Sequence, residues 1–371
     1  MNKPFDAILL VMSVFVAGAI FADGVSARSY VQDGLVACYD GIENAGWGKH
    51  SDNAKEWIDL SGNGCNGFLG GTVAWTEKGW TNDADGQPVV VTNTYLSTVT
   101  GSRKFTVEFA AKPDRANARE AFFSQYDALH SFTFEHNSGG NPKNGRIRIY
   151  GHKTLPTGSD FSVMSKAVVE AGEWASVSAT LAPDLQTIWK NGSKILATTG
   201  TVSVLNSSCE SVIGGEPRRA NMAFKGTYHA FRLYNRVLSE DEIALNAAID
   251  AIRFNGASPT DFKLSGGYSF DDKGNLLVMV TAVTYANDGG MVKVDGEEPT
   301  KMTTVIIKQD GSESVTISAV PDAGYEFEAW TGNIGSVAFA SGSASDARIT
   351  ITAKNAATLK PVFRKVGGLN R

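Results

Sequence analysis

Apolar and polar residues alternate in short runs between Tyr30 and Ala230, and turns rich in Gly, Asn and Asp separate the runs. Because successive side chains of a β-strand point to opposite faces, each run predicts a strand with one buried face. Strands that follow one another about every ten residues are typical of an antiparallel two-sheet sandwich or jelly roll. The clearest inward-facing residues are Phe105, Val107, Phe109, Phe132, Phe134, Ile147, Ile149, Val177, Ala179 and Leu181.

Two local motifs refine this all-β block. Asn191-Gly192 lies between two apolar stretches and predicts a tight hairpin, which also accounts for the glycosylation sequon formed with Ser193. Ser239 and Glu242 have the spacing of a capping box, and apolar residues follow at helical spacing, so one short helix is expected at the end of the block. We assign residues 29–253 to the sandwich with this helix.

The pattern changes after Asn255. Residues 254–265 contain Gly and Pro and are interpreted as a linker, and residues 266–365 form a second, smaller β-rich module before a tail at 366–371. The strands expected in this module cover residues 276–285, 303–308, 314–320, 347–352 and 359–364.

The N-terminus predicts a leader. Lys3 precedes an apolar run from Ala7 to Ala22, which is short for a membrane span, and Val25-Ser26-Ala27 supplies small residues for cleavage. We interpret residues 1–27 as a secretory signal peptide cut after Ala27; an uncleaved anchor is the alternative. The mature protein is then secreted or surface-attached, with no membrane insertion expected.

The charge and composition of the chain limit the classes of partner that it could bind. The 34 Lys and Arg residues against 39 Asp and Glu give a net charge of −5, so the chain has no basic footprint for nucleic acid. Hydrophobic residues make up 42% of the chain, which is enough for buried cores. The chain has 3 cysteines. In an oxidising compartment Cys38 and Cys65 could form a disulfide, and two buried thiols are an equal alternative.

Five motifs in order resemble the landmarks of laminin-G-like, concanavalin A-like jelly-roll domains of secreted bacterial proteins. The resemblance implies a two-sheet sandwich that binds carbohydrate or protein, and it includes catalytic relatives. The motifs are Asp33–Tyr39, Trp57–Gly64, Trp189–Gly192, Ile213–Gly215 and Phe231–Ile243.

The second block resembles the divergent internalin-type B repeat. The motif from Pro321 to Gly332, followed by Ile349-Thr-Ile-Thr and Pro361-Val-Phe363, carries the resemblance. It implies a small β-grasp-like module that spaces or presents the first domain, with Tyr325, Phe327 and Trp330 in its core.

Catalytic motifs are missing from the sequence. A retaining glycosidase needs two carboxylates about 5 Å apart, commonly supplied as E-x-D-x-x-E or E-x-D-x-E on one strand, and neither pattern occurs. There is also no H-E-x-x-H, G-x-S-x-G or P-loop. We therefore predict a non-enzyme.

One loop could hold calcium. Asp59, Ser61 and Asn63 place oxygen atoms at alternating positions before Gly64, as at the start of a calcium loop, but position twelve is Gly70 where a Glu would be needed. A looser, structural calcium site is one interpretation. An Asx-type turn joining two strands is the other.

Aromatic residues in polar loops are the candidates for ligand contact. Trp47, Trp80 and Tyr126 are flanked by polar and flexible residues, and an exposed ring suits the apolar face of a sugar. Our leading hypothesis is a secreted binding or adhesion protein that recognises a glycan or an extracellular surface protein. A glycan hydrolase on the same fold and a structural surface-layer component are the alternatives.

Overall fold

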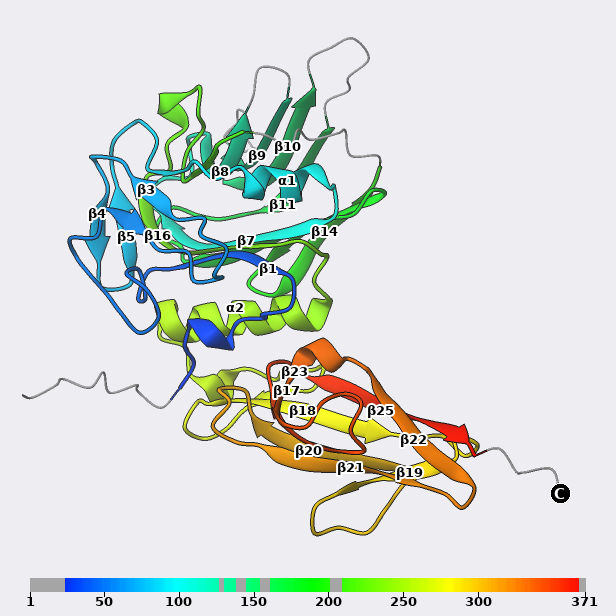
Figure 1. The fold of residues 1–371 in the computed structure, drawn as a ribbon. Helices are drawn as coiled ribbons and strands as arrows, with labels where there is room; N and C mark the ends of the chain where they lie inside the picture. The colour runs from blue at the N-terminus through cyan, green and yellow to red at the C-terminus, as the bar shows by residue number, and fades with distance from the viewer. Residues whose placement is uncertain (1–23, 127–129, 138–144, 154–160, 201–208, 367–371) are drawn as a thin grey trace, which may run out of the picture.

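Two eight-stranded antiparallel sheets, packed face to face, form the N-terminal part of the computed structural model (Figure 1). The structure describes residues 24–126, 130–137, 145–153, 161–200 and 209–366. The expected all-β jelly-roll sandwich with a C-terminal β module is confirmed. No helix among the described residues is both long enough and apolar enough to cross a membrane.

The first sheet is centred on β7 and β16, which pair with each other along most of their lengths. Its order is β14 (Ser193–Thr199), β13 (Leu185–Lys190), β12 (Ala175–Leu181), β7 (Phe105–Pro113), β16 (Gly226–Tyr234), β5 (Gly79–Asn82) and β4 (Ala74–Thr76), with β1 (Leu35–Asp40) also paired to β16.

The second sheet lies across the core from the first. Its order is β11 (Phe161–Val168), β10 (Arg146–Lys153), β9 (His130–Asn137), β8 (Glu120–Tyr126), β15 (Ser211–Ile213), β6 (Val89–Val91), β3 (Gly67–Leu69) and β2 (Glu56–Trp57).

The residues expected to face inward fill the space between these sheets. All ten belong to one buried cluster, which confirms the alternation read from the sequence. The Asn191-Gly192 hairpin is also confirmed, because both residues have the positive φ of 49° and 77° that this tight turn requires.

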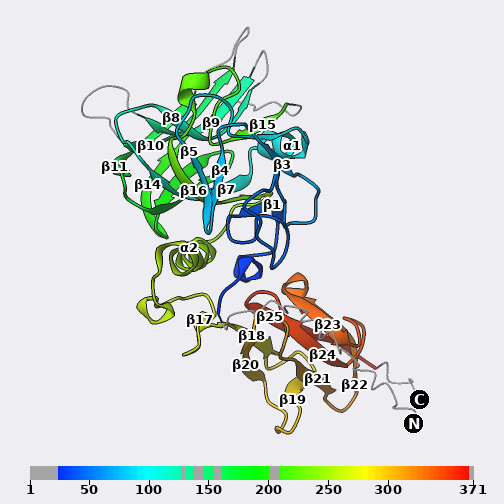
Figure 2. The same ribbon diagram turned by 90° about the vertical axis from the view of Figure 1, so that its left-hand side faces the viewer.

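Helix α2 (Glu240–Asn255) covers the outer face of the first sheet and separates it from the C-terminal module (Figures 1 and 2). Its predicted capping box is present: Glu242 N donates to the Ser239 hydroxyl at 3.3 Å, and Ser239 N donates to the Glu242 carboxylate at 2.8 Å. A second helix, α1 (Tyr95–Gly101), was not expected, because its short run of Thr, Ser and Val carries little helical propensity.

The C-terminal module also consists of two sheets. One contains β17 (Tyr268–Phe270), β18 (Leu276–Val283), β25 (Ala357–Lys365), β22 (Tyr325–Gly332) and β20 (Met302–Lys308); the other contains β19 (Gly290–Val294), β21 (Val315–Pro321), β24 (Arg348–Ala353) and β23 (Val337–Ser341). Its described residues, 266–366, form no α-helix, so the helix of a β-grasp is absent from them. Trp330 is buried as expected, and Tyr325 and Phe327 are half-buried.

The module and the sandwich share an apolar cluster. Ile243 and Ile249 of α2 belong to the same buried cluster as Val278 and Val280 of β18. Gln309 donates a hydrogen bond from its side-chain amide to the carbonyl of Arg28 at 2.9 Å, so the N-terminal segment also contacts the module.

The N-terminal segment that the structure describes is packed, not exposed. Ala27 is buried and its amide donates to the Glu43 carboxylate at 3.0 Å, and the Val25 carbonyl accepts from Arg253 at 3.1 Å. Cleavage after Ala27 would remove both contacts. Residues 1–23 lie outside the described residues, and the leader stays a prediction.

The possible disulfide is not formed, because Cys38 and Cys65 are both free, buried thiols. Cys38 packs in the cluster beneath α2, whereas its neighbour Tyr39 points into the core between the sheets, where Cys65 lies. The alternation of β1 therefore puts the two sulfur atoms on opposite faces of the strand.

Candidate functional site

A groove lined by basic residues lies on the outer face of the second sheet. It consists of two adjoining cavities of about 430 and 400 Å³, and Arg119, Arg219 and Met222 line both. We call it the basic groove. The first cavity is completed by Thr133, Arg148, Tyr150, Glu216 and Arg218, and the second by Asp85, Arg115, Ala118, Asn221 and Lys225.

The alternation of side chains along β10 determines which of its residues form the floor of this groove. Ile147 and Ile149 of β10 point into the core, so Arg148 and Tyr150 point outward from the same strand. In the pairing of β10 with β9, Arg148 lies opposite Glu135, and Tyr150 lies opposite Thr133. The floor is therefore a fixed part of the sheet.

The wall of the groove is the loop after β15, which ends in the short helix η2 (Ala220–Met222). Gly214 starts this loop with φ 75°, and a Cβ atom there would lie 2.5 Å from the ring of Trp80. Gly214 N donates to Phe122 O at 2.9 Å, and Phe224 N donates to Gly214 O at 2.8 Å, which fixes both ends of the loop. A glycine is required here because of both conformation and space.

One buried carboxylate holds two of the arginines. Glu135 has no exposed side-chain surface; Arg119 lies 2.8 Å from its Oε2, and Arg148 donates to its Oε1 at 3.1 Å. The Arg148 guanidinium also lies 4.3 Å from the centre of the Tyr150 ring. These contacts orient both guanidinium groups while leaving them partly exposed.

Arg218 and Arg219, the two arginines of the loop, make fewer contacts with other side chains. The Arg218 guanidinium lies 3.3 Å from the centre of the Tyr126 ring, and its distance to the Glu216 carboxylate is 3.9 Å. Arg219 is exposed, and its side chain makes no ion pair or hydrogen bond with the described residues.

At the far end of the groove, Arg115 donates to the carboxylate of Glu120, and Lys225 lies 3.1 Å from Asp85. Burial raises the pKa of Glu120, although the hydrogen bond and charge of Arg115 oppose the shift. The Glu120 side chain has no exposed surface, so a ligand in the groove does not reach it.

The three aromatic candidates fall in different places. Tyr126 does not line the basic groove, but its ring lies under the guanidinium group of Arg218, which does. Trp47 lies elsewhere, half-buried in the loop after β1, with the Arg28 guanidinium 4.2 Å from its ring. The expectation that Trp80 is an exposed platform is wrong: alternation on β5 points Trp80 into the core, where it is fully buried and stacks on Tyr228.

The Asp59 loop has the geometry of an Asx-type turn. Asp59 Oδ1 accepts from the amides of Cys38 and Ser61 at 3.0 Å, and its Oδ2 accepts from the Ser61 hydroxyl at 2.9 Å and from Cys65 N at 3.1 Å. Asn63 donates to Val36 O at 2.9 Å. Calcium would have to displace donors from both carboxylate oxygens. Its binding at Asp59, Ser61 and Asn63 stays a prediction.

The described residues contain no group of three or more His, Cys, Asp or Glu side chains that could hold a metal ion.

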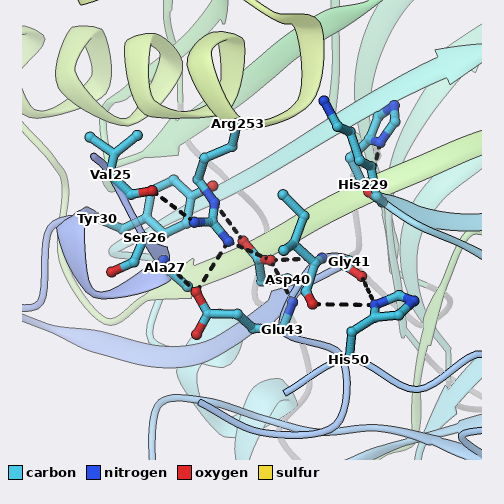
Figure 3. A network of polar contacts seen from close by, with 12 residues as sticks. Val25, Ser26, Ala27, Tyr30, Asp40, Gly41, Glu43, His50, His229 and Arg253 are labelled. Carbon is cyan, nitrogen blue, oxygen red and sulfur yellow. Dashed lines mark hydrogen bonds and ion pairs between the residues drawn. The ribbon is translucent and has the colours of Figure 1, made fainter. Parts of the chain in front are cut away.

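A second polar cluster lies beneath α2 and is buried. Arg253 donates to both oxygens of Asp40 at 3.1 and 2.8 Å and contacts Glu43 at 3.2 Å, as Figure 3 shows. His50 and His229 lie beside it but hydrogen-bond to backbone carbonyls (Figure 3). Because these charges are paired with one another and buried, the cluster is structural.

Two family models match the chain. Residues 83–244 match the concanavalin A-like lectin/glucanases superfamily, and residues 281–367 match the divergent InlB B-repeat domain. Both expected resemblances are thereby confirmed. No curated protein has a matching sequence.

Three of the solved structures that match this chain have low sequence identity to it and TM-scores below 0.5. Domain 4 of AbnA, a GH43 extracellular arabinanase from Geobacillus stearothermophilus in complex with arabinotriose, is 17% identical, with a TM-score of 0.44, over 57% of this chain and 96% of that one. A Trypanosoma rangeli sialidase is 15% identical, with a TM-score of 0.44; the match covers 61% of this chain but only 34% of the sialidase. The CBM40 of a Ruminococcus gnavus IT-sialidase, bound to α2,3-sialyllactose, is 15% identical, with a TM-score of 0.33, over 39% and 83% of the two chains.

None of the residues singled out from the sequence for ligand contact lines the basic groove, although Tyr126 contacts Arg218, which does. Two floor residues could have been found from the segment Arg146-Ile-Arg-Ile-Tyr150, because its polar residues alternate with isoleucines and must point away from the core. The adjacent Arg218 and Arg219 come to the same face only through the turn at Gly214.

Proposed function

We propose that the protein is a non-catalytic carbohydrate-binding protein that holds its ligand in the basic groove. The observation that supports this most strongly is the groove itself, which joins two cavities over an ordered sheet face. Guanidinium groups donate hydrogen bonds in fixed directions, and the Tyr150 ring offers an apolar surface, which together suit the hydroxyls and ring face of a sugar. The C-terminal module would space or present this domain.

The distribution of carboxylates supports binding over hydrolysis. A glycosidase requires two carboxyl groups beside the scissile bond. Glu120 and Glu135 have no exposed side-chain surface and are paired with arginines. The carboxylates that line the cavities are Glu216 in one and Asp85 in the other, and Asp85 pairs with Lys225.

The predicted leader and the two domain types support action outside the cell, in the secreted form or at the surface. An extracellular surface protein is the alternative partner, and a structural role without a ligand is the alternative function.

A glycan array probed with the purified protein, with and without EDTA, tests the proposal. We expect binding that falls roughly fivefold in Tyr150→Ala, because removing an aromatic contact costs about 1 kcal/mol. Tyr285→Ala, at an exposed tyrosine of the C-terminal module, is the matched control and should bind normally. Loss of binding in EDTA would support calcium.

Two results would contradict this function. Release of reducing ends from a bound polysaccharide would show hydrolysis, and no binding to any glycan would favour a structural role.

A further inference from the structure

We infer that the ligand of the basic groove is an acidic oligosaccharide that carries carboxylate or sulfate groups on more than one sugar residue. This inference rests on the proposed function and specifies its ligand class. It depends on the number of cations in the groove, their partners and their spacing along it.

Cations outnumber carboxylates along the groove. Its lining contains six cationic side chains, from five arginines and Lys225, against the carboxylates of Glu216 and Asp85. Two buried carboxylates lie beneath it: Glu120 pairs with Arg115, and Glu135 is shared by Arg119 and Arg148, so six cations face four carboxylates in all. The excess of positive charge stands out on a chain whose net charge is −5.

Charge that is not used within the protein is available to a ligand. Arg219 is exposed and pairs with no described side chain, and the Glu216 carboxylate lies 3.9 Å from Arg218, at the limit of an ion pair. A neutral sugar would not compensate these cations. A carboxylate or sulfate would, because each presents a pair of oxygen atoms that can accept both hydrogen bonds of a guanidinium fork.

The spacing of the cations indicates more than one anionic group. Arg148 and Arg218 line only the first cavity, Arg115 and Lys225 line only the second, and Arg119 and Arg219 lie at the junction. A ligand that fills both cavities therefore meets cations at each end. A chain of sugars with repeated acidic groups has this pattern, whereas a single acidic sugar would occupy one cavity.

Long-range attraction does not explain such binding. The net charge of the chain repels a polyanion, and salt screens charges separated by more than about 8 to 10 Å. Recognition must then come from the local cluster, so a variant at one of its arginines should change affinity while a distant exposed arginine should not.

The test compares glycans that differ only in charge. Dissociation constants are measured calorimetrically for polygalacturonate and its methyl ester, and for a sulfated galactan and its desulfated form. We expect at least one acidic form to bind about tenfold more tightly than its neutral partner, as one charge-assisted hydrogen bond predicts. The two pairs distinguish carboxylate from sulfate as the recognised group.

The matched variants are Arg219→Gln in the groove and Arg364→Gln in the C-terminal module, where the arginine is also exposed and pairs with Glu326. Arg219→Gln should weaken binding of the acidic glycan several-fold more than binding of the neutral form, while Arg364→Gln should change neither.

The inference is overturned if acidic and neutral forms bind equally, or if both variants weaken binding equally, as adsorption of a polyanion to any cation would. If the glycan array returns only neutral ligands, the inference fails and the proposed function stands. If no glycan binds at all, both fail.

Discussion

Replacing Arg232 with methionine is expected to destabilise the sandwich strongly. Arg232 is fully buried on the outer face of the first sheet, beneath α2. Its guanidinium donates to Glu108 at 2.9 Å and to both oxygens of Asp250 at 2.8 and 2.7 Å. Asp250 lies on α2, so this one cation joins the helix to two strands of the sheet.

The magnitude follows from what the substitution leaves behind. Methionine has a similar length but no charge, so two carboxylates with no exposed surface lose their shared cation. Breaking a buried pair in this way costs about 3 to 5 kcal/mol, mostly because the remaining charge is uncompensated. The hydroxyls of Tyr30 and Ser176, which donate to Asp250, and the amide of Asn246, which donates to Glu108, offset only part of that cost.

Urea unfolding followed by tryptophan fluorescence measures the effect. We expect Arg232→Met to lower the free energy of unfolding by about 3 kcal/mol or more, and Asp250→Asn added to it to recover part of the loss. Arg364→Met removes an exposed pair and should cost less than about 1 kcal/mol. Equal losses in the two single variants would refute the reasoning.

Three further predictions concern other parts of the molecule. Ser239→Ala should destabilise α2 by about 1 kcal/mol in the same urea assay, because the N-cap hydroxyl is lost; no change would show that packing alone holds the helix. Burial lowers the pKa of His229 in the folded protein. The contribution of His229 to stability is therefore fully present above the pKa of an unfolded histidine, about 6.5, and is lost as the pH falls below it. His229→Gln should make the urea midpoint less dependent on pH between about 7 and 5, with the rest of the dependence left to His136, whose pKa burial also lowers; an unchanged pH profile would contradict this. A thiol reagent should react first with Cys209 in the folded protein and with three thiols after denaturation. Cys38 and Cys65 react late because both are buried, and burial raises the pKa of Cys65 to about 11. A single reactive thiol in the denatured protein would indicate a disulfide.

The sandwich could be predicted from sequence because strand alternation is a local property. Phe105, Val107 and Phe109 share a face whatever their strand pairs with, and Asn191-Gly192 defines its own turn. The capping box of Ser239 is local in the same way. These features need no knowledge of the rest of the chain.

The candidate site could not be predicted for the opposite reason. Arg119, Arg148 and Arg219 are separated by tens of residues, and only the order of the second sheet brings them together. Trp80 was misassigned because its neighbours are polar, although Gly79 and Gly214 pack closely against β16 and the Trp80 ring and help to bury it. Whether Cys38 and Cys65 can form a disulfide depends on which face of its strand each side chain occupies, and their separation in the sequence does not reveal this.

Hydrogen–deuterium exchange with a bound glycan tests the central claim most directly, because it locates the ligand without any substitution. We predict slower exchange at the backbone amides of the loop from Gly214 to Met222 and of the segment from Arg115 to Arg119, with the C-terminal module unchanged. Protection confined to the Trp47 loop or to the C-terminal module would contradict the assignment of the basic groove as the binding site.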